Sequence, residues 1–291
     1  MMIWQMKDPS YHEPVLVEEV LRELALLKDK KIIDATLGTG GHSLAMLSAG
    51  AEVLGIEADQ EILAIAKERL KGLRITLVQG NFNQIGEIAR ANGFDPVDGV
   101  IFDLGVSNLQ LTNLKRGFSF ASPEVKLDMR LDPEKQGVSG ADLLNSLRKD
   151  QLETLFGRIL DFSSSRWLTK RVIAKRSLGP ILTVGDFLKI CRGLRSKPGL
   201  NPATLPFLAV RVAVNSELEN LKEALHQAFD LLRPGGKLLV IAFHSGERRI
   251  TENFSREFKG PIRPSREEIG KHPRSRSAEL FVLEKEKNEK N

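Results

Sequence analysis

The segment DATLGTGGH, residues 34–42, follows a short apolar run, and its glycines allow the backbone to pass close to a ligand. Glu57 ends the next apolar run and stands 19 residues after Gly38, a separation at which an acid can accept both hydroxyls of an adenosine ribose. Asp59 is a fallback acceptor two residues later. Asp103 ends a fourth apolar run. Together these residues predict a site for a nucleoside-containing cofactor.

Two such cofactors fit a loop of this kind, NAD and S-adenosylmethionine. The dinucleotide fingerprint calls for a third glycine where this chain has Ser43, and it seats a pyrophosphate on the start of a helix. S-adenosylmethionine instead carries a sulfonium cation and an amino-acid end. The acids at Asp34 and Asp103 suit a cation better than a pyrophosphate. We therefore favour the methyl donor, with an NAD-dependent oxidoreductase and a tight turn without a ligand as the alternatives.

Several elements must position these residues. Four apolar runs of strand length (31–36, 52–56, 75–78 and 97–102) alternate with helical patterns at 43–49, 61–70 and 85–91, after a first helical pattern at 14–27. This alternation predicts repeated βα units and a parallel sheet covered on both faces. It stops after residue 111 and returns after 209 with a helix at 217–232, a turn at 233–236, an apolar run at 238–243 and a last strand-like run at 280–283.

The pattern predicts one α/β sheet domain, residues 1–111 plus 212–291, interrupted by a mainly helical insertion at 112–211 on the substrate side. The chain has 43 basic and 38 acidic residues, a net charge of +5, whereas 115–200 alone holds 17 basic and 9 acidic residues, a surplus of 8. The positive excess therefore lies in the insertion. It can complement phosphates, or it can be a solvated helical surface.

Composition excludes several classes of protein. The chain is 41% hydrophobic and 28% charged, as folded domains are, and no stretch approaches the ~18 apolar residues of a membrane span. The start, MMIWQMKDPS, has no secretory pattern. A single cysteine, Cys191, excludes an intramolecular disulfide and a multi-thiolate metal site, and the five histidines show no metal-ligand spacing. We expect a cytoplasmic protein without a metal and without membrane association.

Longer motifs carry a specific resemblance. They are HEPVLVEEV (12–20), GTGGHS (38–43), DLGVSNLQLTNLKRGFSF (103–120), LDMRLDP (127–133), VRVAVNSELENL (210–221), GGKLLVIAFHS (235–245) and PSREEIGKHPRSRSAEL (264–280). With them the chain resembles the bacterial 16S ribosomal RNA cytosine-N4 methyltransferases of the MraW/RsmH type over nearly its whole length. The resemblance implies a class I, Rossmann-like, S-adenosylmethionine-dependent methyltransferase with an inserted helical domain, which methylates a cytosine amino group in the decoding region.

The resemblance also implies the cofactor contacts and the partner. Its cofactor-binding positions fall on Gly40, Gly41, His42, Glu57, Phe82, Asp103 and Gln110. Glu57 stands where many relatives have aspartate, and Phe82 can equally be a core aromatic. The expected partner is small-subunit ribosomal RNA or the assembled small ribosomal subunit; the oligomeric state is open.

The chain departs from the family pattern near the expected substrate side. Residues 162–168 read FSSSRWL where relatives have a Gly-Glu-Glu-Arg-Phe-Ala-like stretch, and 207–211 read FLAVR in place of Phe-Gln-Ala-(Leu/Ile/Val)-Arg. Residues 246–249 read GERR in place of Leu-Glu-Asp-Arg. Cofactor use is therefore better supported than the RNA target. A catalytically altered RNA-binding paralogue and a methyltransferase for another RNA base are the alternatives.

Methyl transfer from a sulfonium is an in-line displacement, in which the enzyme chiefly holds the nucleophile near the methyl carbon. Asp103-Leu104-Gly105-Val106-Ser107 stands where amino-group methyltransferases often have an Asn/Asp-Pro-Pro-aromatic motif. We expect Asp103, with the Leu104 carbonyl or the Ser107 hydroxyl, to organise the cofactor amino acid and the target amine; Asp103 can also serve the cofactor alone. His244, which follows a buried strand, is expected to be a structural hydrogen-bonding group more than a base.

Phosphate contacts give affinity and position, but little sequence information. The candidates are Lys170, Arg171, Lys175 and Arg176 in the insertion, and Arg263, Arg266, Arg274 and Arg276 near the C-terminus. For Arg274 and Arg276 a basic loop over the sheet is the alternative. The target base must leave its stack to meet the methyl group, which single-stranded RNA permits more cheaply than a duplex.

Overall fold

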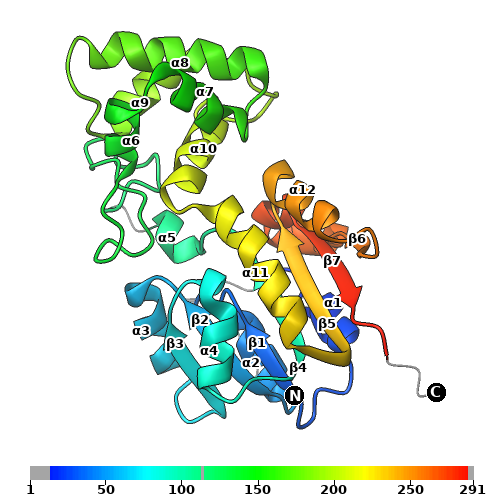
Figure 1. Ribbon diagram of the computed structural model, residues 1–291. Coiled ribbons are helices and arrows are strands. Elements are labelled where there is room, and N and C mark those ends of the chain that lie inside the picture. The colour runs from blue at the N-terminus through cyan, green and yellow to red at the C-terminus, as the bar shows by residue number, and fades with distance from the viewer. Residues whose placement is uncertain (1–13, 113–114, 288–291) are drawn as a thin grey trace. The chain divides into compact units, whose positions relative to one another are not determined.

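The computed structural model describes residues 14–112 and 115–287, which form two compact units (Figure 1). Unit 1 holds the residues up to Val106 and those from Leu218 onward, and unit 2 is Ser107–Glu217. The sequence placed the insertion at 112–211, slightly inside unit 2. The start MMIWQMKDPS, the first two residues of the HEPVLVEEV motif and residues 113–114 of the motif at 103–120 lie outside the described residues. No helix in the described part of the chain is long and apolar enough to cross a membrane.

The elements of unit 1 alternate along the chain as predicted. Before the insertion they are α1 (Val17–Leu24), β1 (Lys31–Asp34), α2 (Gly41–Ser48), β2 (Glu52–Glu57), α3 (Gln60–Arg69), β3 (Ile75–Gln79), the 3-10 helix η2 (Phe82–Gln84), α4 (Ile85–Ala91) and β4 (Val97–Asp103). After it come α11 (Glu217–Leu231), which starts on the last residue of unit 2, β5 (Leu232–Ala242), α12 (Ser245–Phe254), β6 (Lys259–Ile262), α13 (Arg266–Lys271), the 3-10 helix η3 (Pro273–Ser277) and β7 (Glu279–Glu284).

The strands form one sheet in the order β3-β2-β1-β4-β5-β7-β6. Strands β1 to β5 all run parallel to one another, whereas β7 runs antiparallel to both β5 and β6. The chain builds outward from β1 to β3 and then returns to place β4 on the other side of β1. This reversal makes the carboxyl ends of β1 and β4 the point where open α/β sheets bind ligands. The predicted Rossmann-like sheet class is confirmed.

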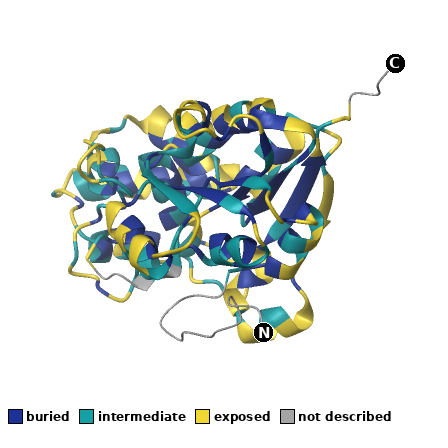
Figure 2. Ribbon diagram, turned by 90° about the horizontal axis from the view of Figure 1, so that it is seen from below, coloured by how far each residue is buried: buried dark blue, intermediate teal, exposed yellow. Residues whose placement is uncertain are grey.

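Successive side chains of each strand point to opposite faces, and both faces are buried. Ile32 and Ile101 pack on the face covered by α1 and α2. Ile33, Val100 and Phe102 pack on the face covered by α4 and α11. Figure 2 shows the strands coloured mostly as buried, with exposed residues on the helices around them. The continuous apolar runs of the sequence therefore arise from a sheet that lies between two helical layers.

Two details of the sheet differ from the sequence prediction. The predicted turn at 233–236 lies inside β5, because Leu232 already pairs with Val97 before the register shifts and Lys237 pairs with Gly99. The backbone N–H of Gly235 donates to the Lys285 carbonyl at 2.8 Å, so the irregular segment is still held to the chain after β7. Strand β6 was not predicted: its sequence, KGPI, is short and contains a glycine and a proline.

Unit 2 is helical in its regular elements, and an isolated bridge joins Lys126 to Thr183. Its helices are α5 (Asn108–Thr112), α6 (Gly140–Ser146), α7 (Lys149–Gly157), α8 (Phe162–Arg176), α9 (Val184–Cys191) and α10 (Thr204–Val214). Phe187 lies at the centre of the core, with its ring 4.8 Å from that of Phe207 and 6.3 Å from that of Phe156. Within this unit, α8 packs against α7 and α9 (Figure 1).

Candidate functional site

Three acidic side chains end three neighbouring strands of unit 1. Asp34, Glu57 and Asp103 are the last residues of β1, β2 and β4, which lie side by side and parallel. Asp34 is almost fully buried, whereas the Asp103 side chain keeps 25% of its surface exposed. The structure thus brings together the acids that the sequence predicted at the carboxyl edge of the sheet.

Glu57 holds the glycine-rich loop against β2. Its two carboxylate oxygens accept the backbone N–H groups of Gly38 and Asp59, both at 2.9 Å. Burial raises the pKa of Glu57 from 4.5 to about 7, although these two hydrogen bonds favour the charged form. Each oxygen retains acceptor capacity beyond its one backbone donor, which is what two ribose hydroxyls require.

The loop needs glycine at its three glycine positions for different structural reasons. A Cβ atom at Gly40 would lie 2.5 Å from Cδ1 of Leu70, and one at Gly41 would lie 2.9 Å from Cγ of Pro14. At Gly38 the nearest atom to such a Cβ is a backbone oxygen at 4.0 Å, although the φ of +53° still favours glycine. A Cβ at Gly38 would therefore make only an ordinary contact, while Gly40 and Gly41 leave room for the protein's own side chains.

His42 lies buried beside two of the acids. Its Nε2 is 3.5 Å from Oδ2 of Asp103, and among the described residues neither ring nitrogen is close and aligned enough for a hydrogen bond. Burial opposes a charged imidazole, but the carboxylates of Asp103 and Asp34 outweigh it and raise the pKa of His42. Burial also raises the pKa of Asp34, partly offset by the hydroxyl of Ser43.

Two hydroxyl residues complete this edge and were missed as site residues. The Thr36 Oγ1 accepts the backbone N–H of Asp103 at 2.6 Å, which ties the loop after β1 to the end of β4. The Ser43 hydroxyl donates to Asp34 at 2.7 Å. Ser43 occupies the position of the absent third glycine, so the departure from the dinucleotide pattern was itself the signal that this residue has another role.

Phe82 starts η2 and is half-buried. Its ring meets that of Phe102 edge to face, with centroids 5.8 Å apart, and packs against the core under α4. The core role left open in the sequence is therefore present, and a cofactor contact through the remaining exposed surface stays a prediction.

Asp59 is not a fallback ribose acceptor. It is 1% exposed and caps α3, where its Oδ1 accepts the N–H groups of Glu61 and Ile62 at 3.0 and 3.5 Å. An acid directly before a helical pattern is a recognised capping signal, so the sequence held this information.

Ser107 and Gln110 lie in unit 2 and bond to each other. The Ser107 N–H donates to the Gln110 side-chain oxygen at 2.8 Å, and the Gln110 N–H donates to the Ser107 hydroxyl at 3.3 Å. Together they cap α5. Their predicted contacts with the methyl donor and the target amine remain predictions.

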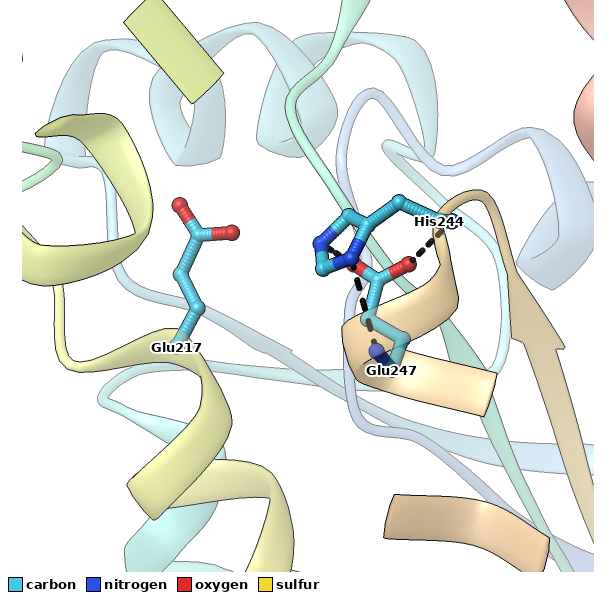
Figure 3. Close-up of side chains that lie close together, drawn as sticks. All are labelled: Glu217, His244 and Glu247. Atoms are coloured by element: carbon cyan, nitrogen blue, oxygen red, sulfur yellow. Dashed lines mark hydrogen bonds and ion pairs between the residues drawn. The ribbon is translucent and has the colours of Figure 1, made fainter. Parts of the chain in front are cut away.

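His244 caps α12, as Figure 3 shows together with Glu247. Its Nδ1 accepts the N–H groups of Gly246 and Glu247 at 3.1 and 3.4 Å, and Glu247 accepts the N–H of His244 at 3.1 Å. Because Nδ1 uses its lone pair in the cap, the ring proton belongs on Nε2, 3.2 Å from Glu247. Glu217, also drawn, belongs to unit 2, where both its oxygens accept from Arg211.

The four predicted phosphate ligands of the insertion differ in how far their side chains are used within the protein. Arg176 is structural, because its Nη1 donates to the carbonyls of Leu144, Asn145 and Leu147 at 2.7 to 3.2 Å and so closes the end of α6. Lys170 is exposed on α8. Arg171 donates to the Ile190 carbonyl at 2.9 Å, and Lys175 lies 3.4 Å from the Gly179 carbonyl.

Near the C-terminus, Arg263 is paired with Glu279 through two hydrogen bonds of 3.1 and 2.6 Å. Arg266, Arg274 and Arg276 are exposed at the surface of unit 1. The C-terminal set therefore has a surface position, and its contact with RNA remains a prediction.

The arrangement fits a cationic nucleoside. Asp103 Oδ1 is a buried acceptor without a hydrogen-bond donor among the described residues, and the Glu57 carboxylate offers acceptors for hydroxyls. These groups are acceptors, whereas a pyrophosphate requires donors. The edge of the sheet is therefore matched to a ligand that carries N–H, O–H and positive charge.

Comparison with known proteins identifies a family and named relatives. A model of the MraW methylase family matches residues 9–260. The chain is 40% identical to a ribosomal RNA small subunit methyltransferase H of Methylacidiphilum infernorum, over 97% of this chain and 96% of that protein. It is 39% identical to the protein of the same name from Thermomicrobium roseum, over 96% of each. Among solved structures, an rRNA methylase from Streptococcus thermophilus is a distant match, with a TM-score of 0.44, 12% identity, and coverage of 91% and 92%.

Proposed function

The chain belongs to the MraW methylase family, and on this premise we propose that it methylates small-subunit ribosomal RNA with S-adenosylmethionine as the donor. We propose that the acceptor is the N4 amino group of a cytosine in the decoding region, which the motifs shared with the family support. The reaction is assigned to the cytoplasm, and either free RNA or the assembled small subunit is the partner.

The observation that carries the choice of donor is the row of acids at the sheet edge. Asp34, Glu57 and Asp103 end three adjacent strands, and Glu57 accepts the N–H of Gly38 in the glycine-rich loop. A donor with a sulfonium and an ammonium group brings positive charge to this edge. A dinucleotide would bring two phosphates next to three carboxyl groups, at a large electrostatic cost.

The residues of this chain then act by binding and by orientation. S-adenosylmethionine supplies a methyl carbon on a positively charged sulfur. Glu57 accepts hydrogen bonds from the ribose hydroxyls, and Asp103 accepts an N–H through its available Oδ1. The cytosine nitrogen attacks the methyl carbon in line, the electron pair of the C–S bond returns to sulfur, and the surplus amine proton leaves to water.

Substitution of Asp103 separates a role in ligand binding from a role in stabilising the fold. Among the described residues its carboxylate accepts no hydrogen bond and lies 3.5 Å from the ring of His42, while Thr36 accepts its backbone N–H. We therefore expect Asp103→Ala to fold normally and to lose methyl transfer, measured with purified protein, labelled donor and small ribosomal subunits. Normal turnover in this variant would remove Asp103 from the mechanism.

The function is tested by mass analysis of small-subunit ribosomal RNA from cells with and without the gene. The enzyme predicts one methylcytosine that disappears on deletion and returns with the wild-type gene, but not with the Asp103→Ala gene. An unchanged methylation pattern would favour an RNA-binding paralogue, and a difference at another base would correct the target. Calorimetry with S-adenosylmethionine and NAD separates the donor assignments, because tight NAD binding would contradict the proposal.

A further inference from the structure

Helix α8 carries an unusual surface. Its sequence, FSSSRWLTKRVIAKR, has five basic residues and no acid. The helix buries Ser165, Leu168, Thr169 and Val172, which face the rest of unit 2. Phe162, Arg166 and Lys170 follow each other at four-residue spacing and are exposed, so they lie on the solvent side of the same helix. We call these three residues the α8 stripe.

Phe162 is the unexpected member of the α8 stripe. Its side chain is 76% exposed. Contact between an apolar ring and water is unfavourable, and a polar residue at this position would avoid it. The guanidinium carbon of Arg166 lies 5.4 Å from the ring centroid, within the range of a cation–π contact. One face of the ring is thus set against a cation, while most of its surface remains open to solvent.

The backbone at Phe162 is firmly held. Asp161 caps α8 by accepting the Ser164 N–H at 2.9 Å, and its two oxygens also accept the hydroxyls of Ser163 and Ser164 at 2.6 and 2.8 Å. These bonds hold the pKa of Asp161 far below its usual range. Because the cap fixes the first turn of the helix, the exposed ring projects from a rigid position.

A second aromatic–arginine pair lies next to the stripe. The guanidinium carbon of Arg171 is 4.8 Å from the ring centroid of Trp167, again at four-residue spacing. Arg171 is fixed by its hydrogen bond to the Ile190 carbonyl. Trp167 is only half-buried, so a second ring contributes to the same basic helix surface.

We propose that the α8 stripe, with Phe162 as its aromatic platform, stacks an unpaired base of single-stranded RNA while Arg166 and Lys170 bind the flanking phosphates. This rests on the proposed function and names the part of unit 2 that holds the RNA. Exposed aromatic rings beside arginine and lysine are what unstructured RNA segments require, because every base has a face that can stack. A second copy of this chain would bring the same positive surface against itself, which disfavours it as the occupant.

The stripe is tested by binding a short fluorescein-labelled single-stranded oligoribonucleotide to the full-length protein, without donor, at several salt concentrations. We expect Phe162→Ala to weaken binding roughly 5- to 150-fold, the range of one lost base–aromatic stack, with an unchanged salt dependence. Phe162→Trp should retain binding. Arg166→Gln and Lys170→Gln should each weaken binding and lower the slope of log affinity against log salt by about 0.7.

The matched control is Leu178→Ala, because Leu178 is 86% exposed in the same unit but lies beyond the end of α8. It should bind RNA like the wild type. Equal RNA affinity of Phe162→Ala and the wild type would overturn the proposal, and so would a loss that Leu178→Ala reproduces. If the stripe proposal fails, methylation of ribosomal subunits by the wild-type protein would still support the proposed function. If the wild-type protein does not methylate the subunits, that result would count against the proposed function and not against the stripe.

Discussion

The pKa of Glu57 predicts that donor binding weakens as the pH falls through neutrality. Burial raises this pKa from 4.5 to about 7, so the free protein at pH 6 holds Glu57 mostly protonated. A protonated carboxyl has lost acceptor capacity, and it must still accept the N–H groups of Gly38 and Asp59. The ribose hydroxyls therefore bind best to the ionised form.

The size of the effect follows from the titration. With a pKa of about 7, roughly 90% of Glu57 is ionised at pH 8 and roughly 10% at pH 6. If only the ionised form binds, the affinity for S-adenosylmethionine falls about tenfold between these two pH values. Binding near pH 7 must also release about half a proton, because the donor selects the ionised carboxylate.

The assay is isothermal titration calorimetry of S-adenosylmethionine at pH 6, 7 and 8, in buffers of different ionisation enthalpy that report the released protons. Glu57→Gln serves as the control, since glutamine does not titrate. We expect it to bind about 10- to 100-fold more weakly at pH 8, as for a lost charge-assisted hydrogen bond. Its remaining pH dependence would belong to His42, whose imidazole faces Asp103, Asp34 and Glu268.

The same titration has a consequence for stability. The folded pKa lies above 4.5, so Glu57 favours the folded state when protonated, and this contribution is lost as the pH rises from about 4.5 through about 7. A shift of this size corresponds to about 3 kcal/mol, as an upper value because the side chain is partly exposed.

Equal donor affinity at pH 6 and pH 8, or a full tenfold change retained in Glu57→Gln, would refute the reasoning about donor binding.

Three further substitutions, two of them with a matched control, test the structural roles, each by urea or thermal unfolding. Gly40→Ala should lose about 1–3 kcal/mol more than Gly72→Ala, because both positions have a φ near +80° but only the first would drive a Cβ into a neighbouring side chain; equal losses would contradict the packing role. Arg176→Met should cost about 2 kcal/mol by leaving the last carbonyls of α6 without their hydrogen-bond donor, whereas Lys170→Met should stay within about 0.5 kcal/mol. His244→Ala should cost about 1 kcal/mol as a lost helix cap; an effect on methyl transfer without one on stability would instead favour a role as a base.

The sequence predicts the sheet edge well because its signals are local. An apolar run of strand length that ends in an acid places that acid at the carboxyl end of a strand, and Asp34, Glu57 and Asp103 all lie there. The parallel order then brings the three together. The reasons for Gly40 and Gly41 were not visible, because they depend on where Leu70 and Pro14 pack and on nothing in the loop itself.

The remaining differences also come from contacts between distant segments. Nothing in the sequence separates Arg176 from Lys170, since only the tertiary fold places the carbonyls that end α6 beside one of them. Asn215 is another case: its side chain donates to the Met129 carbonyl and accepts the Leu131 N–H, and no local pattern indicates this. By contrast, Asp59 was misassigned although its capping signal was present.

The position of unit 2 in the chain has a consequence during synthesis. β4 ends at Asp103, whereas β5, which pairs with one edge of β4, is complete only when Ala242 has been added. On the order of 140 residues must therefore be translated before that edge of β4 is paired. At ~5–20 residues per second a nascent chain carries a bare apolar strand for roughly 7 to 30 s, while the helical unit made in between can already condense. The unpaired edge of such a strand can pair with another chain, so ribosome-bound chaperones should matter most in that interval.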